Sequence, residues 1–136
     1  PKIHVDKAKI IQILLNLTVN AFEACDQGGE ISLSSRIIAD PEKEKDYIAI
    51  SVKDTGPGID PDVLEKIFDP FYSTKSASPD RGLGLPICQN IASQHQGWIE
   101  VQTQPGQGSC FTLMLPLEPV TAEYRNPLTD NSQKLQ

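Results

Sequence analysis

Two asparagines stand four residues apart in a segment whose periodicity predicts a helix. They belong to a single polar stripe on an otherwise apolar helix, which consists of Gln12, Asn16, Asn20 and Glu23. Solvent faces of helices are normally filled with Lys, Glu and Arg, because asparagine is a poor helix former. A carboxamide offers an oxygen to a hard cation and an NH2 group to a phosphate oxygen. The stripe is therefore either an ordinary solvent face or part of a site for a cation and phosphates.

An aspartate ends a predicted strand on its buried face. Apolar residues alternate through residues 47–54, and counting by twos from Ile48 puts Asp54 on the apolar side. A buried carboxylate must find donors, because an unpaired buried ion is costly. An adenine amino group is one such donor, and the glycines in residues 55–59 would let a ligand approach the backbone closely. The same residues also suit an ordinary turn in which the aspartate caps its own loop.

A third candidate lies where an aperiodic stretch enters a predicted helix. Arg81 is followed there by Gly-Leu-Gly-Leu at residues 82–85. Helix N-termini expose unpaired N–H groups and carry a partial positive charge, so they bind phosphates well. Glycines would let those amides reach the ligand. Taken alone, the segment is equally well explained as a tight turn from loop to helix.

The elements that must position these residues follow from the hydrophobic pattern. A helix is expected from Asp6, its N-cap, to Ala24. One apolar row should face the core, formed by Ile10, Leu14, Leu17, Ala21 and Ala24 and widened by Ile11, Leu15 and Phe22.

The remainder of the chain predicts an α+β fold. Strands are expected at 30–38 and 47–54, a short helix at 62–67, a long lid loop at 68–81, a helix at 83–96, and a hairpin of 98–103 with 109–115. This order predicts a two-layer α/β sandwich, in which helices cover one face of a mostly antiparallel mixed sheet.

Composition limits the possible partners and the compartment. The chain has 136 residues and a net charge of −6, without a basic cluster, which argues against nucleic acid and against membrane contact. Cys25, Cys88 and Cys110 are dispersed and predict reduced thiols in the cytoplasm. No apolar run approaches the ~20 residues that span a bilayer. We expect one domain at residues 1–117 and a disordered tail at 118–136, together forming a piece of a longer parent. The sequence leaves open whether that parent is membrane-anchored.

Four segments, in order, resemble the motifs of one family. They are Asn-Leu-Thr-Val-Asn-Ala at 16–21, Asp-Thr-Gly-Pro-Gly at 54–58, Phe-Asp-Pro-Phe at 68–71 and Gly-Leu-Gly-Leu at 82–85. They are similar to the N, first glycine, F and second glycine boxes of the catalytic ATP-binding domain of sensor histidine kinases. That domain belongs to the ATPase superfamily of gyrase, the mismatch-repair ATPases and a heat-shock chaperone. The resemblance covers about residues 5–117.

The resemblance implies a role for each matching residue. ATP and Mg2+ would be the cofactors, with Asn20 as the metal ligand. Catalytic roles would fall to Asn16, beside the phosphates, and to Lys75, which reaches the terminal phosphates from a lid anchored by Phe68 and Phe71. The remaining nucleotide contacts would come from Asp54, Gly56, Gly58, Ile59, Gly82, Leu83, Gly84, Leu85 and, through water, Thr112.

The residue at position 16 bears on the reaction. In the ATP-hydrolysing relatives a glutamate stands there as general base, whereas a carboxamide cannot accept that proton. The resemblance therefore implies slow hydrolysis and transfer of the γ-phosphoryl group to a histidine. The acceptor would lie on an upstream dimerisation domain, homodimeric in the parent, and would pass the phosphoryl group to a response-regulator receiver domain. Neither His4 nor His95 matches the acceptor motif, so the chain should bind ATP without phosphorylating itself.

Two departures from the family pattern keep an alternative open. Asp80 stands where the second glycine box usually begins with a glycine, and Glu23 stands where many relatives have a basic residue. The alternative is a nucleotide-binding pseudokinase or interaction module without transfer activity. A serine-directed kinase of the same superfamily is a third possibility, which the Phe-Asp-Pro-Phe segment disfavours.

Overall fold

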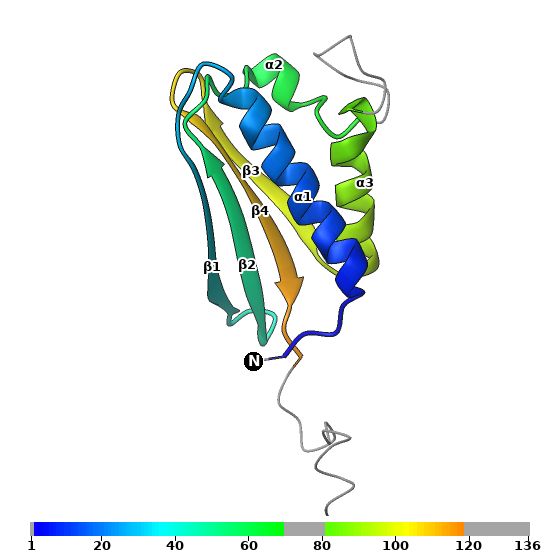
Figure 1. Ribbon diagram of the computed structural model, residues 1–136. Helices are drawn as coiled ribbons and strands as arrows, with labels where there is room; N and C mark the ends of the chain where they lie inside the picture. The colour runs from blue at the N-terminus through cyan, green and yellow to red at the C-terminus, as the bar shows by residue number, and fades with distance from the viewer. Residues whose placement is uncertain (1, 70–80, 119–136) are drawn as a thin grey trace, which may run out of the picture.

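The computed structural model describes residues 2–69 and 81–118, which form helices and strands in the predicted order (Figure 1). The elements are α1 (Lys7–Ala24), β1 (Ile31–Asp40), β2 (Lys45–Asp54), α2 (Pro61–Leu64), α3 (Arg81–Gln94), β3 (Trp98–Gln104) and β4 (Gly108–Pro116). Most of the predicted lid loop and of the predicted tail lie outside the described residues.

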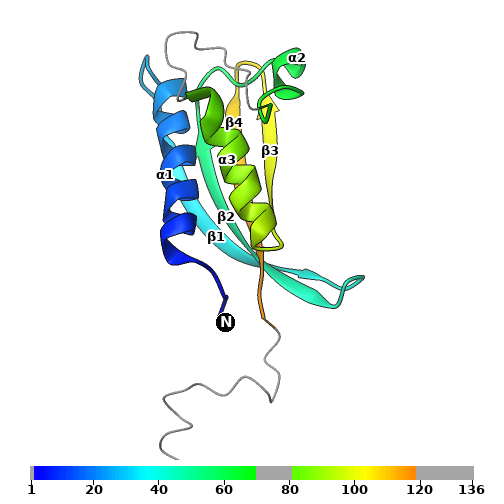
Figure 2. The same ribbon diagram turned by 90° about the vertical axis from the view of Figure 1, so that its right-hand side faces the viewer.

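The strands form a single sheet in the order β1-β2-β4-β3. Each of the pairings in the described part is antiparallel, including the contact of β2 with β4 at the centre. The long helices α1 and α3 lie side by side over one face of this sheet, as both views show (Figures 1 and 2). The predicted α+β sandwich with helices on one face is therefore confirmed.

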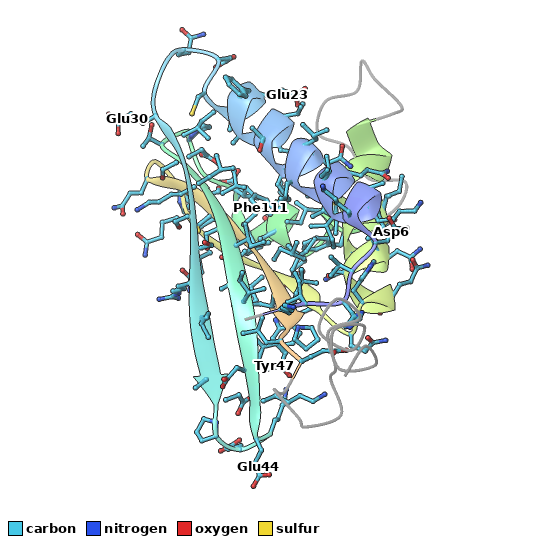
Figure 3. All side chains as sticks on the ribbon, turned by 60° about the horizontal axis from the view of Figure 1, so that its bottom comes forward. Asp6, Glu23, Glu30, Glu44, Tyr47 and Phe111 are labelled. Carbon is cyan, nitrogen blue, oxygen red and sulfur yellow. The ribbon has the colours of Figure 1, made fainter. Side chains whose placement is uncertain are left out.

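The core fills the layer between the sheet and the two helices. Ile13 and Leu17 of α1 and Cys88 of α3 are fully buried there, against apolar residues of β2, β3 and β4. Figure 3 shows Phe111 of β4 in this layer, between the sheet and α1. A second, smaller cluster lies on the other face, where the rings of Tyr47 and Trp98 meet edge to face at 5.1 Å. The sheet thus has one helix-covered face with the main core and one open face with a smaller cluster.

Helix α1 begins as predicted but buries a narrower stripe than expected. Asp6 is the N-cap, and its Oδ1 accepts from the backbone N–H groups of Ala8 and Lys9 at 3.1 and 3.3 Å. The buried residues are Ile10, Ile13, Leu17 and Ala21. Ile11, Leu15 and Phe22, which were predicted to widen the core face, are instead 47%, 60% and 66% exposed. The reason is that α1 packs on β2 and against α3, which leaves its third flank uncovered.

The two shorter helical predictions shift at their ends. Helix α2 is a single turn at Pro61–Leu64 rather than a helix at 62–67. Helix α3 starts at Arg81, two residues before the predicted 83. Because of this earlier start, the glycines at 82 and 84 form the first turn of the helix instead of a preceding loop. Within residues 2–69 and 81–118, no helix combines the length and apolar character needed to cross a membrane.

Histidine 95 joins the end of α3 to the start of α1. Its Nε2 accepts from the backbone N–H of Asp6 at 3.0 Å, and its Nδ1 lies 2.8 Å from the carbonyl oxygen of Ile91. Because Nε2 accepts, Nδ1 carries the proton and donates to Ile91. Nε2 therefore links α3 to α1, while the bond from Nδ1 to Ile91 stays within the end of α3 and orients the ring. His4 lies 3.3 Å from a carboxylate oxygen of Glu118 near the end of β4.

We predict a purely structural effect for a change at position 95. The variant His95→Ala should lower the free energy of unfolding by about 1–2 kcal/mol, because it leaves the Asp6 N–H without its partner, whereas the Ile91 carbonyl keeps the backbone N–H of residue 95. Urea denaturation measures this loss, and nucleotide affinity should stay within about twofold, since one net hydrogen bond far from the site is lost. The exposed His4→Ala serves as the control and should change stability by less than about 0.5 kcal/mol. A stable His95→Ala protein without nucleotide binding would contradict this role.

Candidate functional site

The predicted site segments gather at one end of the sheet. The last turn of α1, the end of β2, the segment that leads to α2, the start of α3 and the turn between β3 and β4 all lie at this end (Figures 1 and 2). In Figure 3, Glu23 marks this end of α1 and Asp6 marks the other. The fold therefore brings residues from distant parts of the sequence to a common rim.

Asp54 ends β2 on the helix-covered face, as the period-two pattern predicts. The residue is only 3% exposed. Its Oδ1 accepts from the backbone N–H of Gly56 at 2.9 Å, so the ordinary turn interaction is present. Its second oxygen, Oδ2, has no hydrogen-bond donor among the described residues. No fully buried side-chain oxygen of the described residues lacks a partner, so Oδ2 still reaches the surface, where it can accept from a ligand donor.

The loop after Asp54 is held in place by close backbone contacts. A Cβ at Gly56 would lie 2.7 Å from the carbonyl oxygen of Ala24, so only glycine allows the loop to lie against the end of α1. Gly58 has φ +77°, and a side chain there would collide with the backbone of Gln104. The sequence analysis expected these glycines to let a ligand approach the backbone, whereas the structure shows them packed closely against neighbouring backbone of the protein itself.

The β3–β4 hairpin braces the same loop from the other side. The N–H of Ile59 donates to Oγ1 of Thr103 at 2.9 Å, and the N–H of Gly106 donates to the carbonyl oxygen of Pro57 at 2.6 Å. The hydroxyls of Thr103 and Ser109 are 2.8 Å apart and hydrogen-bonded to each other. These bonds fix the loop relative to Asp54 before any ligand arrives, which lowers the entropic cost of binding.

The pairing register corrects the prediction for Thr112. Thr112 pairs with Ser51, and their hydroxyl oxygens lie 2.9 Å apart. This pair is on the open face of the sheet, whereas Asp54 lies on the helix-covered face with Phe111. Because side chains alternate along a strand, Thr112 points away from Asp54. It cannot close an adenine site there.

The hydroxyl that the sequence analysis missed belongs to Ser109. Ser109 is the direct partner of Asp54 in the β2–β4 pairing and is 7% exposed. Directly opposed residues share a face, so Ser109 lies beside the carboxylate. Thr103 is in turn the partner of Ser109 in the β3–β4 pairing. The sequence shows a Gly-Ser pair at the start of the last strand, but only the strand register shows that its serine lies opposite Asp54.

Asn16 faces α3 rather than open solvent. Its side chain is half-buried, and Nδ2 donates to Sγ of the buried Cys88 at 3.5 Å. Helices α1 and α3 run antiparallel, because α1 ends and α3 begins at the same end of the sheet (Figure 1). One turn further along α1 therefore corresponds to one turn earlier along α3. Asn20 lies one turn after Asn16, towards the end of α1 that neighbours the start of α3.

The first turn of α3 has open space beside Gly84. A Cβ added to Gly84 would meet no described atom within 4 Å. Leu85, in contrast, packs against the core and anchors the turn. Gly82 and Leu83 lie in the same turn, where N–H groups have no partner within the helix. The unpaired amides and the positive end of the helix dipole suit an anion.

The lid predictions are only partly covered by the structure. Phe68 is half-buried and packs against the core, as do Ile59 and Ile67. Lys75, Phe71 and Asp80 lie outside the described residues, so their predicted roles stay predictions.

The residues present fit a nucleotide with a magnesium ion. The carboxylate oxygen of Asp54 that Gly56 leaves free suits a base amino group, and the start of α3 at Gly84 suits phosphates. Between them, amide oxygens of Asn16 and Asn20 are the hard ligands that Mg2+ accepts, together with phosphate oxygens and water. Neither amide oxygen has a hydrogen-bond partner among the described residues.

Comparison with known proteins gives the same result over most of the chain. The family described as histidine kinase-, DNA gyrase B-, and HSP90-like ATPase matches residues 5–119. The signal transduction histidine-protein kinase AtoS of Escherichia coli K12 is 41% identical over 117 residues, which are 86% of this chain and 18% of AtoS. The chain thus spans less than a fifth of that relative.

Solved structures agree with the sequence comparison. The catalytic domain of histidine kinase ThkA has a TM-score of 0.71 and 34% identity, covering 86% of this chain and 73% of that one. Full-length ShkA in complex with AMPPNP has a TM-score of 0.73 and 33% identity, covering 90% of this chain and 24% of that one. With its fold, ordered motifs and rim of polar groups, the chain belongs to the histidine kinase-, DNA gyrase B- and HSP90-like ATPase family, as an ATPase domain of the sensor histidine kinase type.

Proposed function

We propose that this domain binds Mg-ATP and transfers the γ-phosphoryl group to a histidine on a dimerisation domain outside this chain. The observation that carries the proposal is the carboxylate of Asp54. It is buried, one oxygen is occupied by Gly56, and the other has no donor among the described residues. An adenine amino group supplies that donor, and the triphosphate then runs towards Asn20 and the start of α3. The complex of ShkA with AMPPNP supports an adenine nucleotide as the ligand.

Catalysis in this proposal rests on position and charge. Asp54 and the braced loop fix the base, while the N–H groups at the start of α3 hold the phosphates. Mg2+, when bound, neutralises phosphate charge, and Asn20 supplies its protein oxygen. Asn16 cannot accept a proton from water, which favours transfer over hydrolysis. Lys75 is proposed to reach the terminal phosphates from the lid.

The acceptor must come from elsewhere in the parent protein. The chain contains only two histidines, and both are engaged: His95 joins α3 to α1, and His4 contacts Glu118. We therefore propose a histidine-bearing dimerisation domain, homodimeric in the parent, as the partner, with a response-regulator receiver domain downstream. Use of ATP as the phosphoryl donor supports a cytoplasmic location for this domain.

The proposal is tested by combining binding with transfer. Calorimetric titration should show ATP binding that strengthens when Mg2+ is present. Mixing the chain with the dimerisation domain of its own parent and γ-labelled ATP should give an acid-labile, alkali-stable phosphohistidine on that domain. Absence of ATP binding would overturn the proposal. Intact Mg-ATP binding without phosphohistidine would instead identify a nucleotide-binding module.

A further inference from the structure

The contact between Asn16 and Cys88 links the two helices that frame the site. Nδ2 of Asn16 lies 3.5 Å from Sγ of Cys88, which is fully buried on α3. Cys88 also approaches the carbonyl oxygen of Ile13, one turn before Asn16, at 4.0 Å. The sulfur therefore sits between a backbone acceptor and a side-chain amide, both on α1.

In the hydrogen bond with the Asn16 amide, the Cys88 sulfur is the acceptor. Its single hydrogen has the Ile13 carbonyl as a partner, so the sulfur lone pairs remain for Asn16. Burial raises the pKa of the Cys88 thiol, against the smaller opposing effect of the Asn16 hydrogen bond. An amide oxygen turned towards such a sulfur would meet lone pairs, whereas an N–H group meets an acceptor.

One orientation of the Asn16 amide is consequently preferred. With Nδ2 turned to Cys88, Oδ1 is the end that faces away from α3, and Oδ1 has no partner among the described residues. We propose that Cys88 is a positioning residue that fixes the Asn16 carboxamide so that it offers its oxygen, not its NH2 group, to the bound nucleotide. Asn16 then binds the metal ion or one of its waters. This inference rests on the proposed Mg-ATP function.

The two possible amide orientations have opposite consequences for the metal. An oxygen facing the ligand strengthens nucleotide binding only when Mg2+ is present. An NH2 group facing the ligand would donate to a phosphate oxygen and act equally with or without Mg2+. The dependence of ATP affinity on Mg2+ therefore reports which end of the amide is presented.

The experiment compares Cys88→Ala, which removes the acceptor, with Cys88→Ser, which keeps one. ATP affinity is measured by calorimetry in EDTA and in saturating Mg2+. In Cys88→Ala, the ratio of ATP affinity in Mg2+ to ATP affinity in EDTA should fall by roughly threefold to tenfold, which matches the loss of one weak hydrogen bond. The ATP affinity in EDTA should be unchanged. Cys88→Ser should resemble the wild type. Cys110→Ala, which removes a half-buried thiol on the open face, is the matched control and should change neither value.

A second experiment uses the variant Asn16→Asp, in which the orientation of the side chain at position 16 no longer matters. In Asn16→Asp both distal atoms are oxygens, so the side chain presents an acceptor whichever way it turns. Adding Cys88→Ala to Asn16→Asp should then leave the affinity gained from Mg2+ unchanged. Should Cys88→Ala fail to fold, the 13Cγ resonance of Asn16 in the wild type gives the answer, and it should shift when Mg2+ is added to the ATP-bound protein.

Several outcomes would overturn the inference while leaving the proposed function intact. The first is that Cys88→Ala loses ATP affinity equally with and without Mg2+. The second is that Cys88→Ala reduces the affinity gained from Mg2+ as much in the Asn16→Asp background as in the wild type. The third is that the 13Cγ resonance of Asn16 does not shift when Mg2+ is added. Failure of the proposed function looks different, because the wild type would then not bind Mg-ATP.

Discussion

Replacing Asp54 by asparagine is expected to lower ATP affinity by roughly a hundredfold, since a hydrogen bond to a charged group is lost and a donor clash is gained. Gly56 donates its N–H to Oδ1, so the new side chain must keep its oxygen there and turn its NH2 group to the ligand. That NH2 group would face the amino group of adenine. The NH2 group of the asparagine at position 54 and the amino group of adenine are both donors, so neither finds an acceptor in this buried site.

The same substitution should reverse the base preference. Inosine triphosphate carries an oxygen where adenine has its amino group, so it suits an NH2 donor and not a carboxylate. We expect the wild type to prefer ATP over ITP, and Asp54→Asn to bind ITP at least as well as ATP. Competition titrations with a fluorescent nucleotide measure both ratios. Asp46→Asn, the same change at an exposed position of the same strand, should alter neither. Equal ATP affinities of wild type and Asp54→Asn would remove Asp54 from the base site.

Replacing Asn20 by alanine is expected to remove most of the effect of Mg2+ on ATP affinity. It should also slow transfer to the histidine-bearing domain on the order of a hundredfold or more, because charge neutralisation at the phosphates is among the largest catalytic effects. Asn20 lies in the C-terminal half of α1, at the end of the sheet where α3 begins, and its amide oxygen has no partner among the described residues. Binding of adenosine, which needs only the base site, should be preserved within about twofold, since no hydrogen bond to it is lost.

The control for Asn20 lies on the same polar stripe. Gln12 is two turns earlier on α1 and exposed, so Gln12→Ala should retain the Mg2+ effect and the transfer rate. Calorimetry at several Mg2+ concentrations and a labelled-ATP transfer assay provide the measurements. An Asn20→Ala protein that transfers phosphoryl groups at the wild-type rate would contradict the metal-ligand assignment.

The features that the sequence predicted well are governed by local periodicity. Alternation along β2 placed Asp54 on the helix-covered face, because side chains of a strand alternate regardless of the remaining fold. Asp6 was recognisable as an N-cap because its partners are only two and three residues away. Such features depend on neighbours in sequence, so they are available before the topology is known.

The features that were missed depend on which elements become neighbours. Ser109 lies beside Asp54 only because β4 inserts between β2 and β3 in the sheet, whereas Thr112, chosen from the sequence, falls on the opposite face. Ile11 and Leu15 look like core residues by periodicity, yet α1 packs on β2 and α3 and leaves that flank exposed. Neither the pairing register nor the coverage of a helix flank is encoded by local pattern.

One nucleotide must bridge the base site at Asp54 and the amides of Asn16 and Asn20, and stepwise NMR titration measures this directly. Adenosine alone should shift the backbone amide resonances of Gly56 and Ile59 and leave the two asparagine side chains unchanged. Mg-ATP should shift both sets together, with one common dissociation constant. Side-chain resonances of Asn16 and Asn20 that stay unchanged in saturating Mg-ATP, or that follow a different dissociation constant from Gly56, would contradict a single bridging nucleotide.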